Sequence, residues 1–453
     1  MDDRTGAGQG GGGRAIVTYS RGLQSLSVIR SLGRQGVEVI AADEVPVTPG
    51  SLSKYATDRF TYPSPLKDRP GFIAALEEAI ERFDPGHPDV PYVLMPVHQE
   101  TSVVAAQASR LAPRIRFALA SPDAFDLVQH KGRFHEAAQA RGWPTPRTWL
   151  FRDADELREA AADLPYPNFV KHPNAVSGIG VHRAESAAEL IDAYEQLVVE
   201  HALAPEDRPI VQEAVPGEDY AVTALYDHGQ ARVLLSYRNV LRFPREGGPG
   251  AVRETVRAPK LEAMARRVLD EVRWHGIAQV DFRWTGDDED PAFVIEVNPR
   301  FFGGVLQAIE SGVDYPWLVY RLAVDDHVEA PQELRYDVRT EKPVAGLLAT
   351  IEEIAQSDHR MQEVERIWDQ AKETFRVGEH GSALRSLLAG LRDSMDMPAR
   401  LEHARKLLLE NEENVSTLFD PDDPWPVLGF IYPVALFLRH GHLSSALLSG
   451  AEP

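Results

Sequence analysis

Short apolar runs alternate with amphipathic stretches over the first 120 residues of the chain. Residues 15–18 and 37–42 have the pattern of buried strands, and the residues between them have the spacing of an amphipathic helix that ends near Gly33 and Gly36. The run PYVLMPVHQET repeats the change from strand to loop. Strands that alternate with helices in this way predict a parallel, doubly wound sheet. The first turn lacks the GxGxxG spacing, so dinucleotide binding is unsupported.

The pattern changes after Ser121. A helix is predicted over residues 125–140, because Gly142, Pro144 and Pro146 follow it closely. The stretch NFVKHPNAVSGIGVHR predicts a strand, a loop of small residues and a second strand. More strands follow in PIVQEAVPGEDYAVTALYDHGQARVLLSYRNV, with a turn at residues 227–229. This mixture of helices and strands predicts a second domain.

The C-terminal part is expected to be largely helical, as in MQEVERIWDQAKETF. Its apolar stretch WPVLGFIYPVALFL is short and interrupted by Pro426 and Pro433, so a buried or docking helix is favoured over membrane contact. The first residues, MDDRTGAGQGGGGR, predict a flexible tail and contain no apolar core of a secretory signal. We therefore expect a glycine-rich tail at 1–13, a Rossmann-like domain at 14–120, a mixed domain at 121–330 and a helical region at 331–453.

The composition describes a globular protein with 43% hydrophobic and 26% charged residues. The 48 Lys and Arg residues against 69 Asp and Glu give a net charge of −21, which disfavours nucleic acid as a partner. The absence of cysteine excludes disulfides, thiolate nucleophiles and thiolate zinc sites. Cytoplasm is the default location for a chain of this kind.

The stretch FVIEVNPRFFGG places polar side chains at alternate positions of an apolar strand. Glu296, Asn298 and Arg300 should share one face, because side chains two residues apart in a strand point the same way. A hairpin with the upstream strand GIAQVDFRW would lay Asp281 beside Glu296 and Asn298. Two carboxylates and an amide oxygen suit a hard cation such as Mg²⁺, and Arg300 would complement a phosphate.

A second candidate site follows the strand that ends at Lys171. The backbone N–H groups of the small-residue loop containing Ser177, Gly178 and Gly180 can approach an anion closely. The spacing differs from GxxxxGK[ST], because the lysine precedes the glycines.

In IVQEAVPGEDY a strand runs into a turn, and backbone groups at the strand end could contact an adenine edge. Glu218 or Asp219, just past the turn, could accept a ribose hydroxyl. An ordinary strand and turn with solvated acids would have the same pattern.

The substrate side is less legible. Arg238, Arg242, Arg245 and Arg253 surround the glycine-rich EGGPG and could bind a substrate carboxylate, although a solvated hairpin fits the pattern equally well. Two further groups of residues could line the substrate site or be plain loop and core residues. Phe301, Phe302, Gly303 and Gly304 follow the strand of Glu296, and Tyr19, Arg21, His98 and Glu100 follow strands of the first domain.

Taken in order, these motifs resemble the ATP-grasp superfamily in its carboxylate–amine ligase branch. The resemblance rests on Lys131 in HKGRFHEAAQARGWPTP, Lys171 with its loop, QEAVPGED, and VDF followed by IEVNPR. Similar motifs occur in D-alanine–D-alanine ligase, biotin carboxylase and the carbamoyl-phosphate synthase large subunit. The resemblance implies an α/β chain of the α+β grasp type: a Rossmann-like pre-ATP-grasp domain, a two-subdomain ATP-grasp domain over 121–330 and a C-terminal helical extension.

The resemblance also implies roles for individual residues. Lys131 and Lys171 would hold the ATP phosphates under the loop of Ser177, Gly178 and Gly180. The adenine would lie against Glu213, Ala214 and Val215, with Asp219 on the ribose. Asp281, Glu296 and Asn298 would bind two Mg²⁺ ions, for which Mn²⁺ could substitute, and Arg300 would stabilise the phosphoryl group. His130 departs from the pattern, which commonly has an acid before the first lysine.

The implied activity is an ATP- and Mg²⁺-dependent ligase that forms an amide from a small-molecule carboxylate and an amine through an acyl phosphate. Arg300 and Lys171 would be the catalytic residues, with Arg242, Arg245, Gly303 and Gly304 facing the substrate. The rivals are a carbamoyl-phosphate-synthase-like or carboxylase-type enzyme, a kinase-like enzyme, and a non-catalytic nucleotide-binding protein. The C-terminal region could pack on the rest of the chain, cap the site, form a homodimer surface or contact a membrane.

Overall fold

The structure is a computed structural model of the 453-residue chain. It describes residues 12–174, 180–204, 207–243, 248–329, 333–343 and 414–430, with residues 331, 345, 346 and 349. Of the predicted site residues, Ser177, Gly178 and Arg245 lie outside these ranges, as do most of the predicted tail and most of the predicted helical region. Within the described ranges, no helix has the length and apolar character needed to cross a membrane.

The N-terminal domain is built on a four-stranded sheet in the order β3-β2-β1-β4, in which every pairing is parallel. Its strands are β1 (Arg14–Val17), β2 (Glu38–Asp43), β3 (Ala56–Thr61) and β4 (Tyr92–Met95). Its helices are α1 (Leu23–Arg34), α2 (Arg69–Arg82), α3 (Glu100–Ala106), α4 (Ala108–Leu111) and the 3-10 turn η1 (Gly50–Leu52). The predicted doubly wound sheet is confirmed.

The first helix ends between Gly33 and Gly36, where the sequence predicts. Gly33 lies inside α1, and the chain leaves the helix only after Arg34. Gly36 follows with φ at +80°, a left-handed conformation that glycine adopts without strain.

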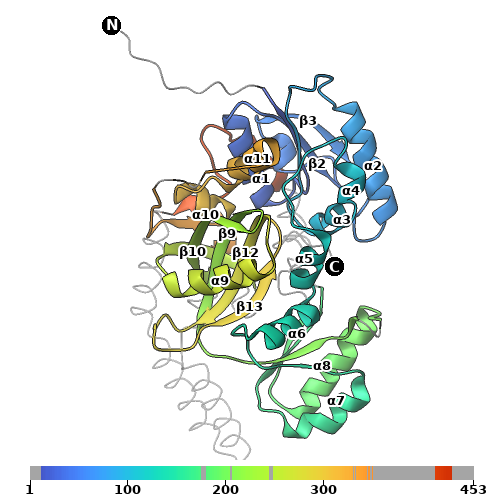
Figure 1. Cartoon of the computed structure of the whole chain (residues 1–453), viewed down its shortest axis with the longest axis vertical. Coiled ribbons are helices and arrows are strands. Elements are labelled where there is room, and N and C mark those ends of the chain that lie inside the picture. The colour runs from blue at the N-terminus through green and yellow to red at the C-terminus, as the bar shows by residue number, and fades with distance from the viewer. Residues whose placement is uncertain are drawn as a thin grey trace, which may run out of the picture.

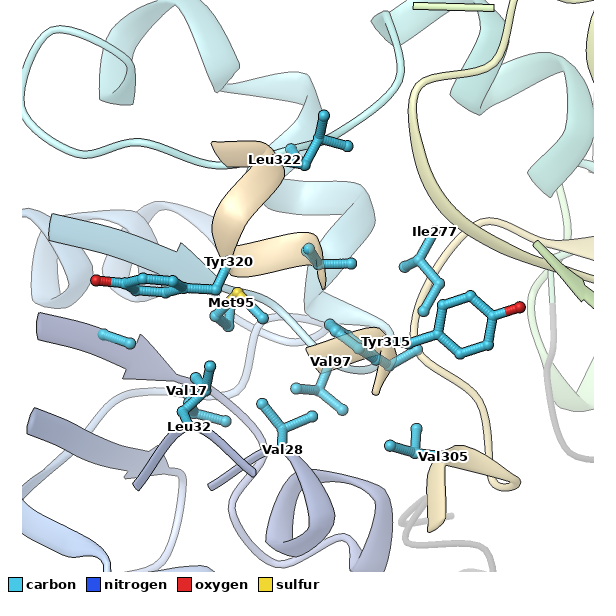
Figure 2. Packing of buried hydrophobic residues seen from close by; sticks show 14 of the residues in the cluster. Val17, Val28, Leu32, Met95, Val97, Ile277, Val305, Tyr315, Tyr320 and Leu322 are labelled. Atoms are coloured by element: carbon cyan, nitrogen blue, oxygen red, sulfur yellow. The ribbon is translucent and has the colours of Figure 1, made fainter. Parts of the chain in front are cut away.

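Helix α11 (Tyr315–Asp325) packs on the same side of the parallel sheet as α1 (Figure 1). Its apolar core also contains residues of the large sheet, so the helix joins the two large domains. Figure 2 shows Val17, Val28 and Leu32 of the N-terminal domain meeting Tyr315 and Tyr320 of this helix. Side chains of this core are fully or almost fully buried, so the two domains share one apolar interior.

A small antiparallel sheet in the order β5-β8-β6-β7 carries α7 (Ala154–Ala160) and α8 (Ala187–Glu200) on one face. Its strands are β5 (Thr148–Leu150), β6 (Asn168–Lys171), β7 (Val181–Ala184) and β8 (Ile210–Glu213), with the 3-10 turn η2 (Ala161–Asp163). In Figure 1 this unit lies at the end of the molecule opposite the N-terminal domain.

The large sheet has the order β13-β12-β9-β10-β11-β14-β15, with α9 (Pro259–Glu271) packed on one face. Its strands are β9 (Glu218–Asp227), β10 (Gln230–Arg242), β11 (Gly250–Val256), β12 (Gly276–Trp284), β13 (Phe293–Asn298), β14 (Arg339–Glu341) and β15 (Val415–Ser416), and α10 (Val305–Glu310) follows β13. Because β14 and β15 belong to it, this sheet extends past residue 330, where the helical region was expected to begin.

The helix predicted over 125–140 is two helices, which corrects the sequence-based prediction. Helix α5 (Pro122–Gln129) ends at His130, and α6 (Lys131–Arg141) begins directly after it. His130 has extended backbone angles, and its Nδ1 accepts a hydrogen bond from the N–H of Arg133 at 3.2 Å. The imidazole therefore caps α6 as an Asp side chain would. This break makes Lys131 the first residue of a helix.

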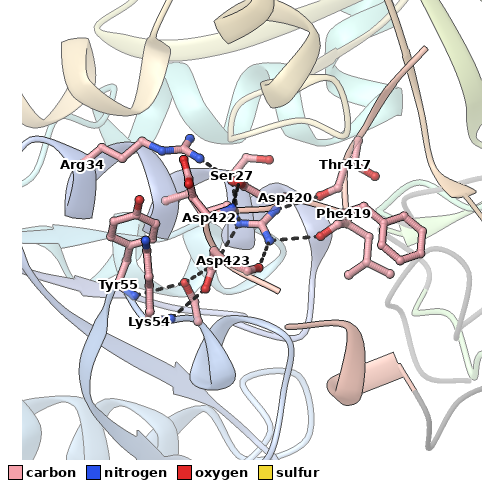
Figure 3. A network of polar contacts seen from close by, with 12 residues as sticks. Ser27, Arg34, Lys54, Tyr55, Thr417, Phe419, Asp420, Asp422 and Asp423 are labelled. Atoms are coloured by element: carbon pink, nitrogen blue, oxygen red, sulfur yellow. Dashed lines mark hydrogen bonds and ion pairs between the residues drawn. The ribbon is translucent and has the colours of Figure 1, made fainter. Parts of the chain in front are cut away.

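A short C-terminal segment, residues 414–430, ties the N-terminal domain to the large sheet (Figure 3). It contains β15 and the 3-10 helix η4 (Trp425–Phe430). Asp423 is completely buried and accepts hydrogen bonds from Arg30 Nε at 2.9 Å, Ser53 Oγ at 2.7 Å and the Lys54 N–H at 2.8 Å. We call residues 414–430 the strap.

Candidate active site

The three predicted metal-binding side chains lie together on the β12–β13 hairpin. Asp281 is directly opposite Glu296 in the antiparallel register, and Gln279 is opposite Asn298. Asn298 Nδ2 donates to Asp281 Oδ2 at 2.8 Å and to Glu296 Oε1 at 3.2 Å. The amide thus spans the two carboxylates, as the alternation in the sequence predicted.

The pKa values of the Asp281 and Glu296 carboxyls shift in opposite directions. Burial, and then the charge of Glu296, raise the pKa of the Asp281 carboxyl. Burial acts in the same direction on Glu296, but Lys131 and Lys171 outweigh it and lower the pKa of that carboxyl. Lys131 Nζ lies 3.1 Å from Glu296 Oε2. A cation bound between the carboxylates would relieve the repulsion that raises the pKa of Asp281.

The donor atoms fit magnesium. Asp281, Glu296 and Asn298 offer only oxygen ligands, and neither histidine nor cysteine takes part, so the set suits a hard divalent cation. Glu296 and Asp281 would supply the charge, and the Asn298 amide would turn its oxygen toward the ion.

Arg300 lies two residues beyond the end of β13, and its side chain reaches the same site. Its Nη2 donates to Asn298 Oδ1 at 2.9 Å and its Nη1 to the Phe301 carbonyl at 3.1 Å. The side chain is buried, and its Nε has no hydrogen-bond partner. The guanidinium is therefore held beside the candidate metal site with one N–H left for a ligand.

Lys171, the last residue of β6, faces Glu296 from the small sheet. Its Nζ donates to Gln212 Oε1 at 2.5 Å, and Gln212 Nε2 in turn lies 2.9 Å from His135 Nε2 and 3.0 Å from Thr148 Oγ1. Burial lowers the pKa of Lys171 to about 8, because the charge of Glu296 offsets only part of the lost hydration. The lysine is thus oriented by a buried polar chain that the sequence did not reveal.

The two lysines are linked at the backbone as well. The N–H of Lys131 donates to the carbonyl of Pro173, two residues beyond Lys171, at 3.0 Å. At the far end of the following loop, Gly180 has φ at +63° and its carbonyl accepts from the His172 N–H at 2.8 Å. This arrangement brings the start of α6 and both ends of the loop together.

The residues predicted to contact adenine lie at the end of β8. The Glu213 carboxylate accepts from the Arg147 N–H and from Arg147 Nε, each at 2.8 Å, and the Glu213 N–H donates to the Arg147 carbonyl. The Ala214 N–H donates to the Pro167 carbonyl at 3.1 Å. The Glu213 side chain is therefore turned toward Arg147, and Val215 follows at the exit of the strand.

Asp219, the predicted ribose contact, is ion-paired with two arginines. Arg283 Nη1 lies 2.8 Å from Asp219 Oδ1, and Arg242 Nη1 contacts the other oxygen. Arg242 Nε also donates to the Gly248 carbonyl at 2.9 Å. Arg242, predicted to face the substrate, is therefore a neighbour of the predicted ribose contact.

The site face of the large sheet carries polar residues that the sequence reasoning missed. Gln279 Nε2 donates to Asp281 Oδ1 at 2.5 Å, and Tyr237 OH donates to Gln279 Oε1 at 2.7 Å. The alternation of Gln279, Asp281 and Arg283 along one strand was the signal in the sequence that could have pointed to Gln279. Tyr237, on another strand, had no such signal.

The strand ends of the N-terminal domain border this site. Tyr19 follows β1 with φ at +57°, and its ring stacks on His98 after β4, with centroids 4.3 Å apart. These strands are adjacent at the point where the strand order reverses, which is where open α/β sheets bind ligands. Burial, and then Arg300, hold the pKa of His98 well below its usual range. Two of the four predicted loop residues thus stack on each other.

The other two predicted loop residues have partners within the domain. Arg21 Nε donates to Asp43 Oδ1 at 2.7 Å. Glu100 Oε1 accepts from Thr18 Oγ1 at 2.5 Å and from the N–H groups of Val97 and His98. Glu100 therefore fixes the loop that carries His98.

Comparison with known proteins supports the ATP-grasp fold that the sequence motifs predict. A family model described as "ATP-grasp in the biosynthetic pathway with Ter operon" matches residues 206–343. A D-alanine–D-alanine ligase of Pseudomonas fluorescens is 31% identical over 109 residues, which cover 24% of this chain and 31% of the relative. A second, from Geobacillus kaustophilus, is 29% identical and covers 49% of this chain and 65% of the relative. The chain thus spans less than two thirds of either relative.

Solved structures agree at lower sequence identity. The biotin carboxylase domain of the 2-oxoglutarate carboxylase of Hydrogenobacter thermophilus, solved with MgADP, ADP and bicarbonate, has a TM-score of 0.58 at 17% identity, covering 72% of this chain and 73% of that one. An L-amino acid ligase of Bacillus licheniformis has a TM-score of 0.54 at 17% identity, covering 73% and 78%. The shared arrangement is that of the ATP-grasp fold.

Proposed function

We propose that this chain, which belongs to the ATP-grasp superfamily, is an ATP- and Mg²⁺-dependent ligase that joins a carboxylate to an amine. The observation that carries the proposal is the convergence of Asp281, Glu296 and Asn298 on one sheet face with Lys131 in contact with Glu296. This set brings oxygen ligands for a cation and an ammonium group for a phosphate to one place. Proteins similar to this chain include ligases of the same kind, the D-alanine–D-alanine ligases and the L-amino acid ligase.

Nucleotide binding would use the two buried lysines. Lys131 and Lys171 approach Glu296 from α6 and β6, so their ammonium groups can hold the ATP phosphates next to the cation. Asp219 would accept the ribose hydroxyls once one of its two arginine partners turns aside. Bound Mg²⁺ would neutralise phosphate charge and polarise the γ-phosphoryl group.

In the first step, a carboxylate oxygen of the acid substrate attacks the γ-phosphorus, and the bond from that phosphorus to the β–γ bridging oxygen of ATP breaks. ADP leaves and an acyl phosphate remains. Arg300, with its unpartnered Nε, is placed to offset the negative charge that spreads over the equatorial oxygens.

In the second step, the nitrogen of the amine attacks the acyl carbon. The tetrahedral intermediate collapses with loss of inorganic phosphate, and the nitrogen gives up a proton to the departing phosphate. Exclusion of water protects the acyl phosphate, which is the role expected of the loop between Lys171 and Gly180.

The test is a matrix of carboxylic acids and amines, with ADP and phosphate release as the readout. A ligase releases phosphate in quantity only when both partners are present, and ¹⁸O from a labelled carboxylate appears in that phosphate. Glu296→Ala should abolish release, whereas Glu289→Ala, at the exposed tip of the same hairpin, should not. Undiminished turnover by Glu296→Ala would refute the assignment.

The same assay separates the rival activities. A carboxylase-type enzyme would require bicarbonate, which is present in the Hydrogenobacter structure, and a kinase-like enzyme would yield a phosphorylated product without an amine. A non-catalytic protein would bind ATP and release nothing. We also propose a cytoplasmic protein that acts as a homodimer, since the Hydrogenobacter domain was solved as a dimer. Light scattering after size exclusion tests the dimer.

A further inference from the structure

Arg253 is a buried cation that neighbours the Tyr237 hydroxyl, and among the described residues no carboxylate forms an ion pair with it. It lies on β11, on the sheet face that carries Asp281, and its side chain is only 4% exposed. Its guanidinium carbon lies 5.9 Å from the centre of the Tyr237 ring, while Nε and Nη1 have no hydrogen-bond partner. A buried guanidinium with two nitrogen atoms that lack hydrogen-bond partners is costly, which makes it a candidate for binding an anion.

Lys342, the residue after β14, adds a second cation at the same place. Burial, and then the charge of Arg253, lower the pKa of Lys342 to about 7. Gly303 lies between the two: a Cβ on Gly303 would stand 2.9 Å from Arg253 Nη2 and 3.7 Å from Lys342 Nζ. The absence of a side chain at Gly303 therefore leaves a space that both cations border.

Charge pairing sets these two residues apart from four other cations of the chain, whereas Arg300 and Lys171 contact uncharged partners beside the metal ligands. Arg242 and Arg283 share Asp219, Arg238 is paired with Glu254, and Lys131 is paired with Glu296. Among the residues that the structure describes, neither Arg253 nor Lys342 forms an ion pair with a carboxylate. The surplus positive charge is therefore local to the space beside Gly303.

The order of the strands separates this space from the metal ligands. Asp281 lies on β12, and β9 and β10 lie between β12 and β11. Three strand spacings amount to roughly 14 Å between the backbones of Asp281 and Arg253. Arg253 therefore approaches the site from a different strand than the residues expected to hold the phosphate and the cation.

We propose that Arg253 and Lys342 bind a carboxylate that the reaction does not consume, carried by one of the two substrates. This inference rests on the proposed ligase function and specifies its substrate class: at least one substrate is an amino acid or a dicarboxylic acid. The charge-assisted hydrogen bonds of Arg253 and Lys342 select the ionised group, and Gly303 leaves room for it.

Succinate is the probe in a thermal-shift experiment on the full chain with MgADP present, which fills the phosphate sites. Succinate should raise the melting temperature of the wild type, and succinamide, its neutral counterpart, should not. Arg253→Met should weaken the response at least tenfold in succinate concentration, because a hydrogen bond to a charged group is worth that much. Equal responses of the wild type and Arg253→Met, or no response of the wild type, would overturn the proposal.

Arg238→Met is the matched control. Arg238 lies on the opposite face of the same sheet, where Glu254 already neutralises it at 2.7 Å, so its succinate response should equal that of the wild type. Without succinate, Arg253→Met should melt a few degrees above the wild type, since it removes a buried, unpaired charge. A fall in both melting temperature and succinate response would mean a structural role, and Gly303→Ala then decides, because its methyl group enters the space, 2.9 Å from Arg253 Nη2, without removing either cation from the chain.

Two further measurements identify the source of the carboxylate and separate this proposal from the proposed function. In the ADP-release assay, Arg253→Met should raise KM for the acid if the acid carries the group, and KM for the amine if the amine carries it. Glu296→Ala should stop ADP release and keep the succinate response. Succinate binding without any ligase turnover in the wild type would contradict the ligase function and leave the anion site standing.

Discussion

Lys131 Nζ, at the first position of α6, lies 3.1 Å from Glu296 Oε2 on β13. One residue is expected to hold a phosphate and the other a metal ion, yet here they neutralise each other. Binding of the nucleotide with its cation would therefore replace this ion pair by two new ones. The pair keeps both charges compensated when no ligand is bound.

A double-mutant cycle should measure this compensation. We expect Lys131→Met and Glu296→Gln to be coupled by about 1–3 kcal/mol in the free energy of unfolding without nucleotide, because either single change leaves a buried partner unpaired. Urea unfolding of the four proteins provides the measurement. Additive effects would show that the two side chains do not interact in solution.

Replacement of Asp281 should weaken the metal site without dismantling it. Asp281→Asn keeps the shape of the side chain and its contact with the Asn298 amide but removes one of two charges, so half-maximal activation should need at least tenfold more Mg²⁺. ADP release followed over a Mg²⁺ titration tests this. Asp288→Asn, in the exposed turn of the same hairpin, should have an unchanged Mg²⁺ requirement.

His135 should make the protein less stable in mild acid. Burial lowers the pKa of His135 to about 3, so the folded chain resists a proton that the unfolded chain accepts below its ordinary pKa. The contribution of neutral His135 to the free energy of unfolding is complete above about pH 6.5 and is lost progressively as the pH falls toward 3. At pH 5 the free energy of unfolding is about 2 kcal/mol lower.

The variant His135→Gln can still accept the hydrogen bond from Gln212 and cannot take up a proton in this range. Thermal unfolding at pH 7.5 and pH 5.0 should show a smaller loss for this variant than for the wild type. His87→Gln changes an exposed histidine and should lose as much as the wild type.

Asp423 should contribute far more to stability than its neighbour Asp422. Asp423→Ala removes the carboxylate nearest to buried Arg30 and leaves only Asp420, at 3.7 Å, so it should cost about 3 kcal/mol, whereas exposed Asp422→Ala should change stability by less than about 0.5 kcal/mol. Figure 3 shows both residues on the strap. Similar unfolding curves for the two variants would mean that the strap does not hold the N-terminal domain.

The sequence predicted the hairpin of the site well because local rules determine it. Alternation placed Glu296 and Asn298 on one face, a turn of TGDDEDP joined the strands, and Asp281 lies opposite Glu296 as expected. Val297, between Glu296 and Asn298 in the strand, is buried in the apolar core. Periodicity and turn chemistry require no knowledge of distant residues.

Arg253 was one of four candidate arginines in the sequence, but its pairing with Lys342 escaped prediction because it depends on contacts between distant strands. Arg253 stands beside Lys342 only because β14 joins the edge of β11, a pairing that no local pattern specifies. Four arginines surrounded EGGPG in the sequence, and the structure distinguishes the three that it describes, Arg238, Arg242 and Arg253, by their partners. The break at His130 was missed for a related reason, since a histidine at the cap position is less recognisable than an acid.

The contact between Arg30 and Asp423 also has a consequence for biosynthesis. The two residues are separated by 393 positions, so a ribosome making this chain exposes Arg30 long before its partner exists. At typical rates of 5–20 residues per second, the interval is roughly 20–80 s. During that time the first domain can form its parallel sheet but must keep Arg30 hydrated. The N-terminal domain therefore reaches its final packing last, although it is translated first.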